Sequence, residues 1–366
     1  MDPLIAKAML RPYNLAHDEI VSLLALEDTA ELFSAAYELK CRQVGKVVAL
    51  RGLIELGNHC AKNCYYCGIR RGNPNVRRYR LSEDDALRMA RWSFEQGYGS
   101  VVLQSGEIES DENTEYIGRI VKRIHDFGGD DFGITLCLGE QTEEVYRFWR
   151  EAGAHRYLLR IESSVPELYA KLHPADHSYA RRVECLRALK RLGYQTGSGV
   201  MCGLPGQTLD DLANDIEFYH DMDLDMIGMG PYLPHKDTPL GSDIEITPEY
   251  AANQLKLGLK MIAVTRLYLH DVNIAATTVL QALDDRGREQ GLLAGANVMM
   301  PNVTDTEYRE NYQLYENKPC LEENSTKCRN CLNWRVLAIG EKINWGQRGD
   351  SPHCKTFPDS NKGKKS

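Results

Sequence analysis

The 366-residue chain lacks several features that mark common classes of protein. It has no apolar run of the roughly 18 residues that a membrane span needs. Its first residues, Met1 to Arg11, lack the basic-then-apolar order of a signal peptide, so we expect a cytoplasmic protein. Basic residues are not in excess: 44 Lys and Arg stand against 52 Asp and Glu, for a net charge of −8. Neither a membrane nor a nucleic acid is therefore expected as a partner.

Cysteine, in contrast, is abundant. An odd number, 11, in a chain without an export signal argues against a disulfide framework and favours metal or redox chemistry. Six cysteines fall in two clusters, Cys60, Cys64 and Cys67 in the first and Cys320, Cys328 and Cys331 in the second. Of the scattered ones, packing roles are assigned to Cys41, Cys137, Cys185 and Cys202, and no role to Cys354.

Between residues 50 and 300, short apolar runs alternate with longer segments of helical periodicity. This alternation is typical of repeated strand-helix units and a parallel sheet. Eight such units predict an α/β fold, a complete (β/α)8 TIM-type barrel. The expected strands are Ala49–Leu56, Ser100–Gln104, Gly133–Leu138, Arg156–Ile161, Gly197–Met201, Met226–Met229, Val272–Ala276 and Ala296–Met299.

The barrel is expected over residues 46–305, between two flanking segments. Residues 1–45 form a predicted N-terminal helical cap that closes the barrel floor. Residues 306–350 form a predicted C-terminal cap, an appendage that carries the second cysteine cluster. Residues 351–366 end in a polar, lysine-rich run and are predicted to be a disordered tail.

Reacting groups in barrels of this kind lie at the C-terminal ends of the strands. Polar residues that are unusual for a strand do follow the expected strand ends here. They are the three cysteines of the first cluster, Gln104 to Glu107, Gly139 and Glu140, Arg160 and Glu162, and Thr277 and Thr278.

The first cluster has the spacing CxxxCxxC, so three thiolates can reach one inorganic centre from a single loop. Structural zinc takes four ligands, whereas three thiolates on a 4Fe-4S cluster leave one iron open to a substrate. The open iron indicates catalysis. Zinc completed by a distant residue such as His59, or a chance grouping of buried thiols, are the alternatives.

This motif, with an aromatic residue before its last cysteine, resembles that of the radical S-adenosylmethionine (SAM) superfamily. The resemblance implies that the open iron chelates SAM, which one electron cleaves to methionine and a 5′-deoxyadenosyl radical. It places Tyr66 near the adenine and matches Ser105, Gly106 and Glu107 to the motif that accepts the methionine ammonium. Matches to further SAM-binding positions are Glu162 for the ribose hydroxyls, Arg182 for the methionine carboxylate and Thr135.

Each assignment has a plainer alternative. Glu107 could cap the next helix, and Arg182 could lie on a solvated helix face beside Arg181. Thr277 and Thr278 could bond only to backbone at a strand end, and the tyrosines discussed next could be packing under the C-terminal cap.

A longer set of motifs resembles the HydE-type maturases of FeFe hydrogenases, radical SAM enzymes with a biotin synthase-like fold. The matching segments are Cys60–Gly68, Arg77–Arg80, Leu103–Glu107, Leu138–Glu140, Arg156–Glu162, Gly203–Thr208, Gly228–Leu240, Ile274–Thr278, Ala296–Asn302 and Tyr312–Cys320. The resemblance implies action on a cysteine-bound iron carbonyl cyanide fragment during assembly of the hydrogenase H-cluster. Other hydrogenase maturation proteins and an electron donor are the implied partners.

Such a substrate is small, anionic and polar, and it needs hydrogen-bond donors in an otherwise apolar barrel. The predicted donors to this small anionic substrate are Gln104, Arg160, Thr277, Thr278, Tyr312 and Tyr315. Met299 and Met300 are predicted to form soft walls. Arg160 and Glu162 are two residues apart on an expected strand, so both should face the same side.

The second cluster, Cx7CxxC, matches an extra site that some members of this family carry. A 2Fe-2S or 4Fe-4S cluster is expected there, with zinc as a rival and Cys354 or His353 as a possible fourth ligand. For the whole chain, a methylornithine synthase-like carbon-skeleton mutase and a non-catalytic iron-sulfur scaffold are the competing functions. Biotin synthase itself is disfavoured, because its second cluster lies inside the barrel.

Overall fold

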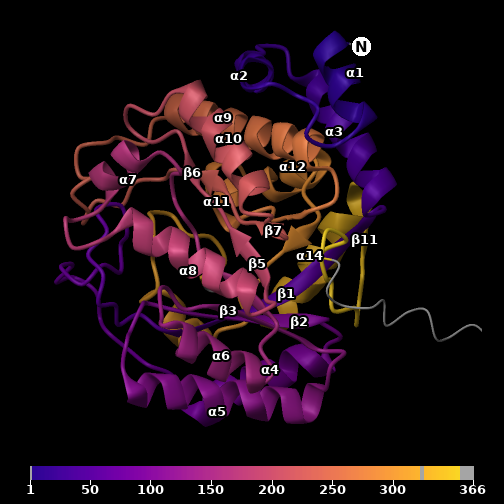
Figure 1. The fold of residues 1–366 in the computed structure, drawn as a ribbon. Helices are drawn as coiled ribbons and strands as arrows, with labels where there is room; N and C mark the ends of the chain where they lie inside the picture. The colour runs from indigo at the N-terminus through magenta and orange to yellow at the C-terminus, as the bar shows by residue number, and fades with distance from the viewer. Residues whose placement is uncertain (1, 322–324, 355–366) are drawn as a thin grey trace, which may run out of the picture.

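The computed structural model describes residues 2–321 and 325–354. Eight parallel strands form one curved sheet in the order β10-β1-β2-β3-β4-β5-β7-β9, with helices on its outer side (Figure 1). The strands are β1 (Val47–Gly57), β2 (Ser100–Ser105), β3 (Gly133–Cys137), β4 (Arg156–Leu158), β5 (Gln195–Ser198), β7 (Met226–Ile227), β9 (Asn273–Ile274) and β10 (Val298–Met299). All eight expected strands are thus present, most of them shorter than expected.

The two ends of this sheet approach each other. Ala275, directly after β9, forms a parallel bridge with Val298 of β10. The backbone amide of Asn297 donates to the carbonyl of Ile274, and that of Ala276 to the carbonyl of Val298, both at 2.9 Å. A further short strand, β11 (Lys342–Ile343), pairs with the start of β1.

The glycine-rich fifth segment forms two short strands in place of one. β5 ends at Ser198, and β6 (Met201–Cys202) pairs with β8 (Gly230–Pro231) in a separate two-stranded sheet. At Gly199 an added Cβ would lie 2.3 Å from the carbonyl oxygen of Gly228, so only glycine permits this close backbone contact.

The helices begin at residues that cap their free amides. The side chains of Ser82, Ser110, Thr142 and Thr208, for example, accept hydrogen bonds from the first turns of α4, α5, α6 and α9. The helices that cover the sheet are α4 (Glu83–Glu95), α5 (Asp111–Gly128), α6 (Glu143–Glu151), α7 (Pro166–Leu172), α8 (Tyr179–Arg191), α9 (Leu209–Asp221), α10 (Pro248–Leu269), α11 (Thr278–Leu283) and α12 (Gly287–Leu293).

The N-terminal helices are α1 (Pro3–Leu10), α2 (His17–Ala25) and α3 (Ala30–Gln43). They do not close the floor of the barrel as expected: α3 packs along α10, and α2 packs along α9. The C-terminal part holds α13 (Thr306–Arg309) and α14 (Ser325–Ala338).

The segment 346–354 lies instead across the N-terminal ends of the strands. Arg51 on β1 donates to the carbonyl of Gly349 at 3.2 Å, and Arg156 on β4 pairs with Asp350 at 2.9 Å. The amide of Ser351 donates to the Gln195 side chain on β5 at 3.1 Å. Long polar side chains at the strand starts thus bind this irregular segment, a long-range contact that local periodicity does not reveal. Residues 351–354 are packed here, and the predicted disorder of residues 355–366 lies outside the described residues.

The segment 346–354, called the floor segment below, ends next to a histidine whose protonation stabilises the fold. The ring of His353 lies 2.9 Å from Asp271 and 3.0 Å from Asp223, and these carboxylates raise the pKa of His353 to about 9. Because the folded pKa exceeds the unfolded one, this stabilisation is complete below about pH 6.5 and is lost as pH rises through about 9.

We therefore expect the free energy of unfolding to fall by about 2 kcal/mol more in the wild type than in His353→Gln between pH 6.5 and 9. Urea titrations at the two pH values measure this difference. An equal pH dependence in both proteins would contradict the assignment.

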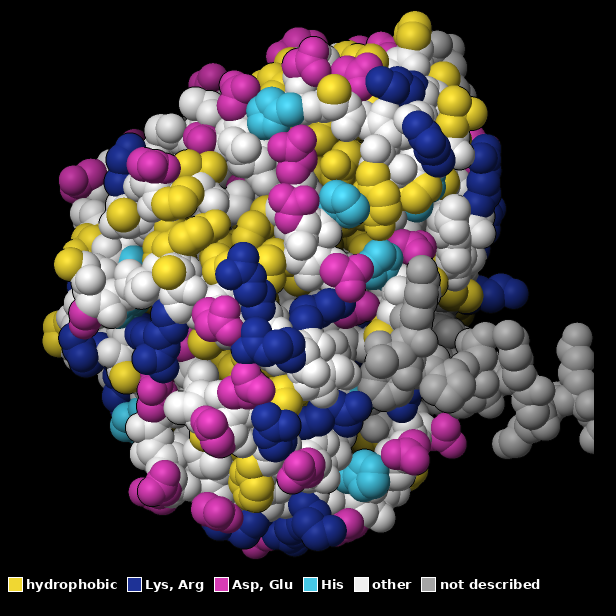
Figure 2. Space-filling view, in the orientation of Figure 1, with side chains coloured by type: hydrophobic (Ala, Val, Ile, Leu, Met, Phe, Trp, Pro, Cys, Tyr) yellow, Lys and Arg dark blue, Asp and Glu magenta, His cyan; other side chains and the backbone are white. Residues whose placement is uncertain are grey.

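Cationic and anionic side chains are interspersed over the face seen in Figure 2, and no field of one sign dominates it. None of the helices in the described ranges is both long and apolar enough to cross a membrane.

Candidate active site

A cavity of about 340 Å³ opens at the C-terminal ends of the strands. It brings together residues from loops far apart in the sequence. The predicted site residues that line it are Cys60, Cys64, Tyr66, Cys67, Gln104, Ser105, Gly106, Glu107, Arg160, Glu162, Arg182, Thr277, Thr278, Tyr312 and Tyr315.

The loop with the first cysteine cluster packs directly on the end of β2. A Cβ on Gly106 would lie 2.2 Å from the carbonyl oxygen of His59, so this close approach requires glycine. The amide of Ala61 donates to the carbonyl of Glu107 at 2.8 Å, and the amide of Glu107 donates to Cys60 Sγ at 3.4 Å. The glycine therefore fixes the position of the first cysteine.

Burial raises the pKa of all three thiols, to about 12 for Cys64. Buried thiols of this kind become thiolates when a metal centre takes the proton's place. Within residues 2–321 and 325–354, no group of three or more His, Cys, Asp or Glu side chains is arranged to hold a single metal ion. A cuboidal cluster is larger than one ion, and each thiolate binds a different iron. The three cysteines on one cavity wall fit that larger group.

Buried atoms around the cavity also fit a polar ligand. Arg160 Nε is buried and makes no hydrogen bond with the described residues, while the buried Glu107 Oε1 and Glu162 Oε2 contact cations of this chain, Lys62 Nζ at 3.1 Å and Arg160 Nη2 at 3.0 Å. Each carboxylate oxygen can accept a further hydrogen bond, and a ligand with an ammonium and hydroxyl groups would supply such donors.

Four buried charges lie beside the cysteine loop. Arg182 Nε donates to Glu140 Oε1 at 2.6 Å, and Lys62 Nζ lies 3.1 Å from both Glu140 Oε2 and Glu107 Oε1. Arg181, which is half-exposed, pairs with Glu109 at the surface at 2.7 Å, and its Nε lies 3.4 Å from Glu140 Oε2. Arg182 is thus the buried one of the two arginines.

Glu107 does not cap the next helix, because Ser110 caps α5. Its carboxylate turns inward, where burial raises its pKa and Arg182 acts in the opposite sense.

Arg160 and Glu162 face the same cavity, although β4 ends before them. Arg160 Nη2 lies 3.0 Å from Glu162 Oε2. Glu162 has φ of 66°, a left-handed backbone that is rare for this residue type and common at functional sites. The turn, rather than strand alternation, therefore brings the two side chains together.

Tyr66 is held by a histidine that sequence reasoning missed. His173 Nδ1 lies 2.8 Å from the carbonyl of Tyr169, and Nε2 lies 3.4 Å from the Tyr66 hydroxyl. Burial lowers the pKa of His173 to about 3, so its ring is neutral. Nδ1 therefore carries the proton, and Nε2 accepts the bond from Tyr66.

Another region of the cavity wall combines barrel and cap residues. Gln104 Nε2 donates to the Tyr312 hydroxyl at 3.2 Å. Lys318 pairs with the buried carboxylate of Glu55 and donates to the carbonyl of Tyr312 at 2.7 Å. Glu55 and Gln104 are register neighbours on β1 and β2. Neither Glu55 nor Lys318 stood out in the sequence, because only the fold brings the cap onto β1.

Two predicted residues lie elsewhere. Thr135 is buried inside β3, and its hydroxyl lies 3.4 Å from Arg156, toward the floor and away from the cavity. Met300 lines the cavity, whereas Met299 is in the hydrophobic core. The Thr277 hydroxyl lines the cavity and donates to the Met229 carbonyl at 3.3 Å, so the backbone-bonded alternative is present and the role toward a substrate stays a prediction.

The second cysteine cluster is outside the cavity. Cys328 and Cys331 are three residues apart on α14, so they share a helix face. Cys320 and Cys331 both raise the pKa of Arg335, so both cysteines lie near this arginine. The two residues suggested as a fourth ligand, His353 and Cys354, both lie in the floor segment, residues 346–354. His353 bonds to Asp271 and Asp223, and Cys354 raises the pKa of Arg156.

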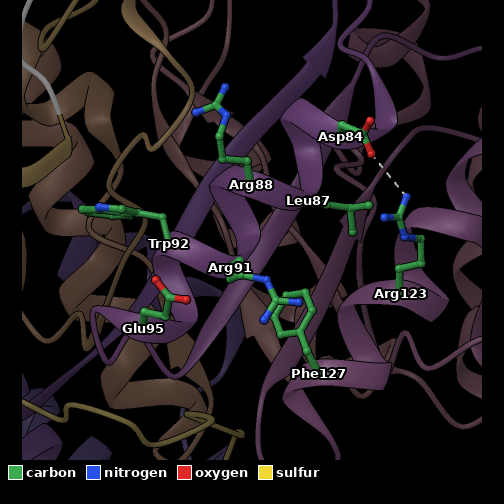
Figure 3. A pocket seen from close by; sticks show the side chains of 8 residues that line it. All are labelled: Asp84, Leu87, Arg88, Arg91, Trp92, Glu95, Arg123 and Phe127. Carbon is green, nitrogen blue, oxygen red and sulfur yellow. Dashed lines mark ion pairs between the residues drawn. The ribbon is translucent and has the colours of Figure 1, made fainter.

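A second hollow of about 440 Å³ lies outside the barrel, between α4 and α5 (Figure 3). Its cations bind their own neighbours: Arg123 lies 3.5 Å from Asp84, and the Arg91 guanidinium lies 4.3 Å from the centre of the Phe127 ring. It has no cysteine in its lining, so we assign the chemistry to the barrel cavity.

A parallel α/β fold with CxxxCxxC thiols and a largely apolar cavity that holds a few charged groups at its strand ends defines the radical SAM class. In agreement, residues 54–219 match the family model described as the Radical SAM superfamily. Within this class the chain belongs to the family of the [FeFe] hydrogenase maturase subunit HydE. It is 45% identical to that protein of Thermotoga maritima over 319 residues, 87% of this chain and 88% of the relative.

More distant relatives share the fold. The 3-methylornithine synthase of Methanosarcina acetivorans is 26% identical over 315 residues, 83% of this chain and 85% of that protein. The crystal structure of methylornithine synthase (PylB) superposes with a TM-score of 0.78 at 23% identity, covering 94% of this chain and 98% of that one.

Proposed function

We propose that this protein cleaves SAM to a 5′-deoxyadenosyl radical and uses it on a cysteine-bound iron carbonyl cyanide fragment during assembly of the [FeFe] hydrogenase H-cluster. One observation carries the proposal: a single buried cavity joins three cysteines, charged groups suited to methionine and ribose, and further polar donors. The 45% identity to a HydE maturase supports the choice of reaction.

When bound by the three thiolates, a 4Fe-4S cluster supplies the electron and an open iron. The chain's own residues bind and orient SAM. Glu107 accepts the methionine ammonium at Oε1, in place of Lys62, Arg182 pairs with the carboxylate, and Glu162 accepts the ribose hydroxyls. Tyr66, fixed by His173, lies against the adenine.

The remaining donors orient the second substrate. Arg160, Gln104 and the Tyr312 hydroxyl offer hydrogen bonds to carboxylate, cyanide or carbonyl groups, together with Thr277, Thr278 and Tyr315. The apolar wall between them, which includes Leu159, Val279 and Met300, excludes water from a radical. We also propose that the barrel is complete, because a bridge between Ala275 and Val298 joins the two ends of the sheet.

The deciding experiment supplies the anaerobically reconstituted protein with SAM, dithionite and the iron complex, and measures activation of an apo-hydrogenase in the presence of the other maturation proteins. Activation that depends on SAM is expected. Methylornithine formed from lysine would favour the mutase, and a failure to cleave SAM would favour a scaffold.

We also propose an accessory iron-sulfur cluster, 2Fe-2S or 4Fe-4S, on Cys320, Cys328 and Cys331, and a cytoplasmic location. The shared helix face of two of these cysteines supports the cluster, and the absence of disulfides among all 11 cysteines fits a reducing compartment.

Replacing Cys331 or Cys328 with alanine is expected to leave SAM cleavage largely intact, because neither lines the cavity. The exposed Cys331 gives the cleaner variant, since Cys328 is buried. 5′-Deoxyadenosine formation per first cluster measures the effect, and complete loss in both variants would overturn the accessory role.

A further inference from the structure

Glu140 lies between the two side chains proposed to hold the methionine part of SAM. Its backbone amide donates to Glu107 Oε2 at 2.9 Å, and its carboxylate accepts from Arg182 Nε at 2.6 Å. The residue is 1% exposed. One buried residue thus contacts both partners through separate atoms.

The groups around Glu140 offer one acceptor and one donor to a ligand. Glu107 Oε1 contacts only Lys62 Nζ among the ion pairs of the described residues, at 3.1 Å, and can accept a second donor or exchange this one. Arg182 uses Nε on Glu140 and Nη1 on the carbonyl of Arg160, each at 2.6 Å, which leaves Nη2 for a carboxylate. The spacing between this acceptor and this donor therefore depends on Glu140.

The charges also balance. Glu107 and Glu140 are matched by Lys62 and Arg182, and Lys62 bridges the two carboxylates at 3.1 Å, while the solvated Arg181 lies farther out, 3.4 Å from Glu140 Oε2. An amino-acid zwitterion adds one charge of each sign and keeps the group neutral. Its ammonium can take the place of Lys62 at Glu107 while Lys62 stays on Glu140. Burying this set of charges is tolerable only while each one is paired.

We propose that Glu140 is a positioning residue for the methionine zwitterion of SAM, which it recognises indirectly by fixing Arg182 and Glu107. The inference rests on the proposed function, because SAM is the ligand. A carboxylate at this position sets both the reach and the direction of the guanidinium.

The test compares Glu140→Gln with the wild type as anaerobically reconstituted full-length protein. Glutamine keeps the backbone bond to Glu107 and removes the charge that holds Arg182 and that also pairs with Lys62. We expect affinity for SAM to fall by about 10- to 100-fold, the usual effect of removing such an orienting partner. KM for SAM should rise in parallel, with kcat for its cleavage nearly unchanged.

Decarboxylated SAM separates this role from a general disturbance. It lacks the group that Arg182 binds, so its equilibrium affinity should be nearly equal in both proteins. The wild type should then discriminate between the two compounds much more strongly than the variant. Glu109→Gln, which removes only the surface partner of Arg181, should behave as the wild type.

An equal loss of affinity for both compounds, or no loss for SAM, overturns the proposal. If Glu140→Gln fails to fold or to bind iron, Glu140→Asp keeps the charge with a shorter reach. It should discriminate at an intermediate level, and discrimination equal to the wild type overturns the role. A wild type that neither binds nor cleaves SAM would instead refute the proposed function.

Discussion

Replacing Cys64 with alanine is expected to abolish SAM cleavage. Each of the three thiolates of the cysteine loop would hold a different iron of the cluster. Apart from these three, Cys137 is the one cysteine that lines the cavity among the described residues, and it lies on β3 and not on this loop. The cluster therefore loses a ligand that nothing replaces, and 5′-deoxyadenosine formation with dithionite should fall to background.

The same result is expected for Cys60→Ala and Cys67→Ala. Cys41→Ala is the matched control, since this cysteine is on α3 and outside the cavity. Iron content and the absorbance of the reconstituted cluster show whether the loss follows from cluster binding. Unchanged 5′-deoxyadenosine formation in all three loop variants would falsify the assignment.

Replacing Lys40 with methionine is expected to lower the free energy of unfolding by about 3–5 kcal/mol, because it leaves a buried carboxylate without its counter-ion. Lys40 on α3 pairs with Glu341, between α14 and β11, at 2.6 Å, and both side chains are 0% exposed. The pair ties the N-terminal helices to the C-terminal appendage. Loss of this pair should therefore weaken the packing of the N-terminal helices and of the C-terminal appendage together.

Two variants test this reasoning by urea denaturation. Lys46→Met, at a nearby exposed lysine, should change stability little. The double variant Lys40→Met, Glu341→Gln should recover most of the loss, because it removes both charges. A double variant as unstable as the single one would show that lost packing, and not the unpaired charge, causes the effect.

The strands were predictable because each is a short apolar run bounded by turns and helix caps, and these are local signals. The ends of β4 and β5 were harder to predict from the sequence. The run Arg156 to Ile161 is apolar enough for one strand, yet regular pairing ends at Leu158, and the chain rejoins its neighbour by a parallel bridge between Glu162 and Val200. Glycines likewise divided the fifth run where Gly199 meets Gly228.

Motif matches predicted residues of the cavity but not the residues that hold them. Glu140 was visible as a polar residue at a strand end, while its bonds to Arg182 and Glu107 were not. The pair of Lys318 and Glu55 joins residues 263 apart in sequence. Thr135 was predicted from resemblance alone to contact the cofactor. Its position on β3 turns its side chain toward Arg156.

The sequence by itself determined the alternation of strands and helices, the cysteine loop with its open-iron chemistry, and the family. These follow from hydrophobic period and residue spacing, which are local along the chain. Only the tertiary structure decided that the C-terminal segment and not the N-terminal helices covers the barrel floor. It alone distinguished Arg182 from Arg181 and joined Glu140, Lys62 and Glu107 in one charge-balanced group. Buried charges must find partners wherever the fold places them, and no local pattern records which distant residue will supply the opposite charge.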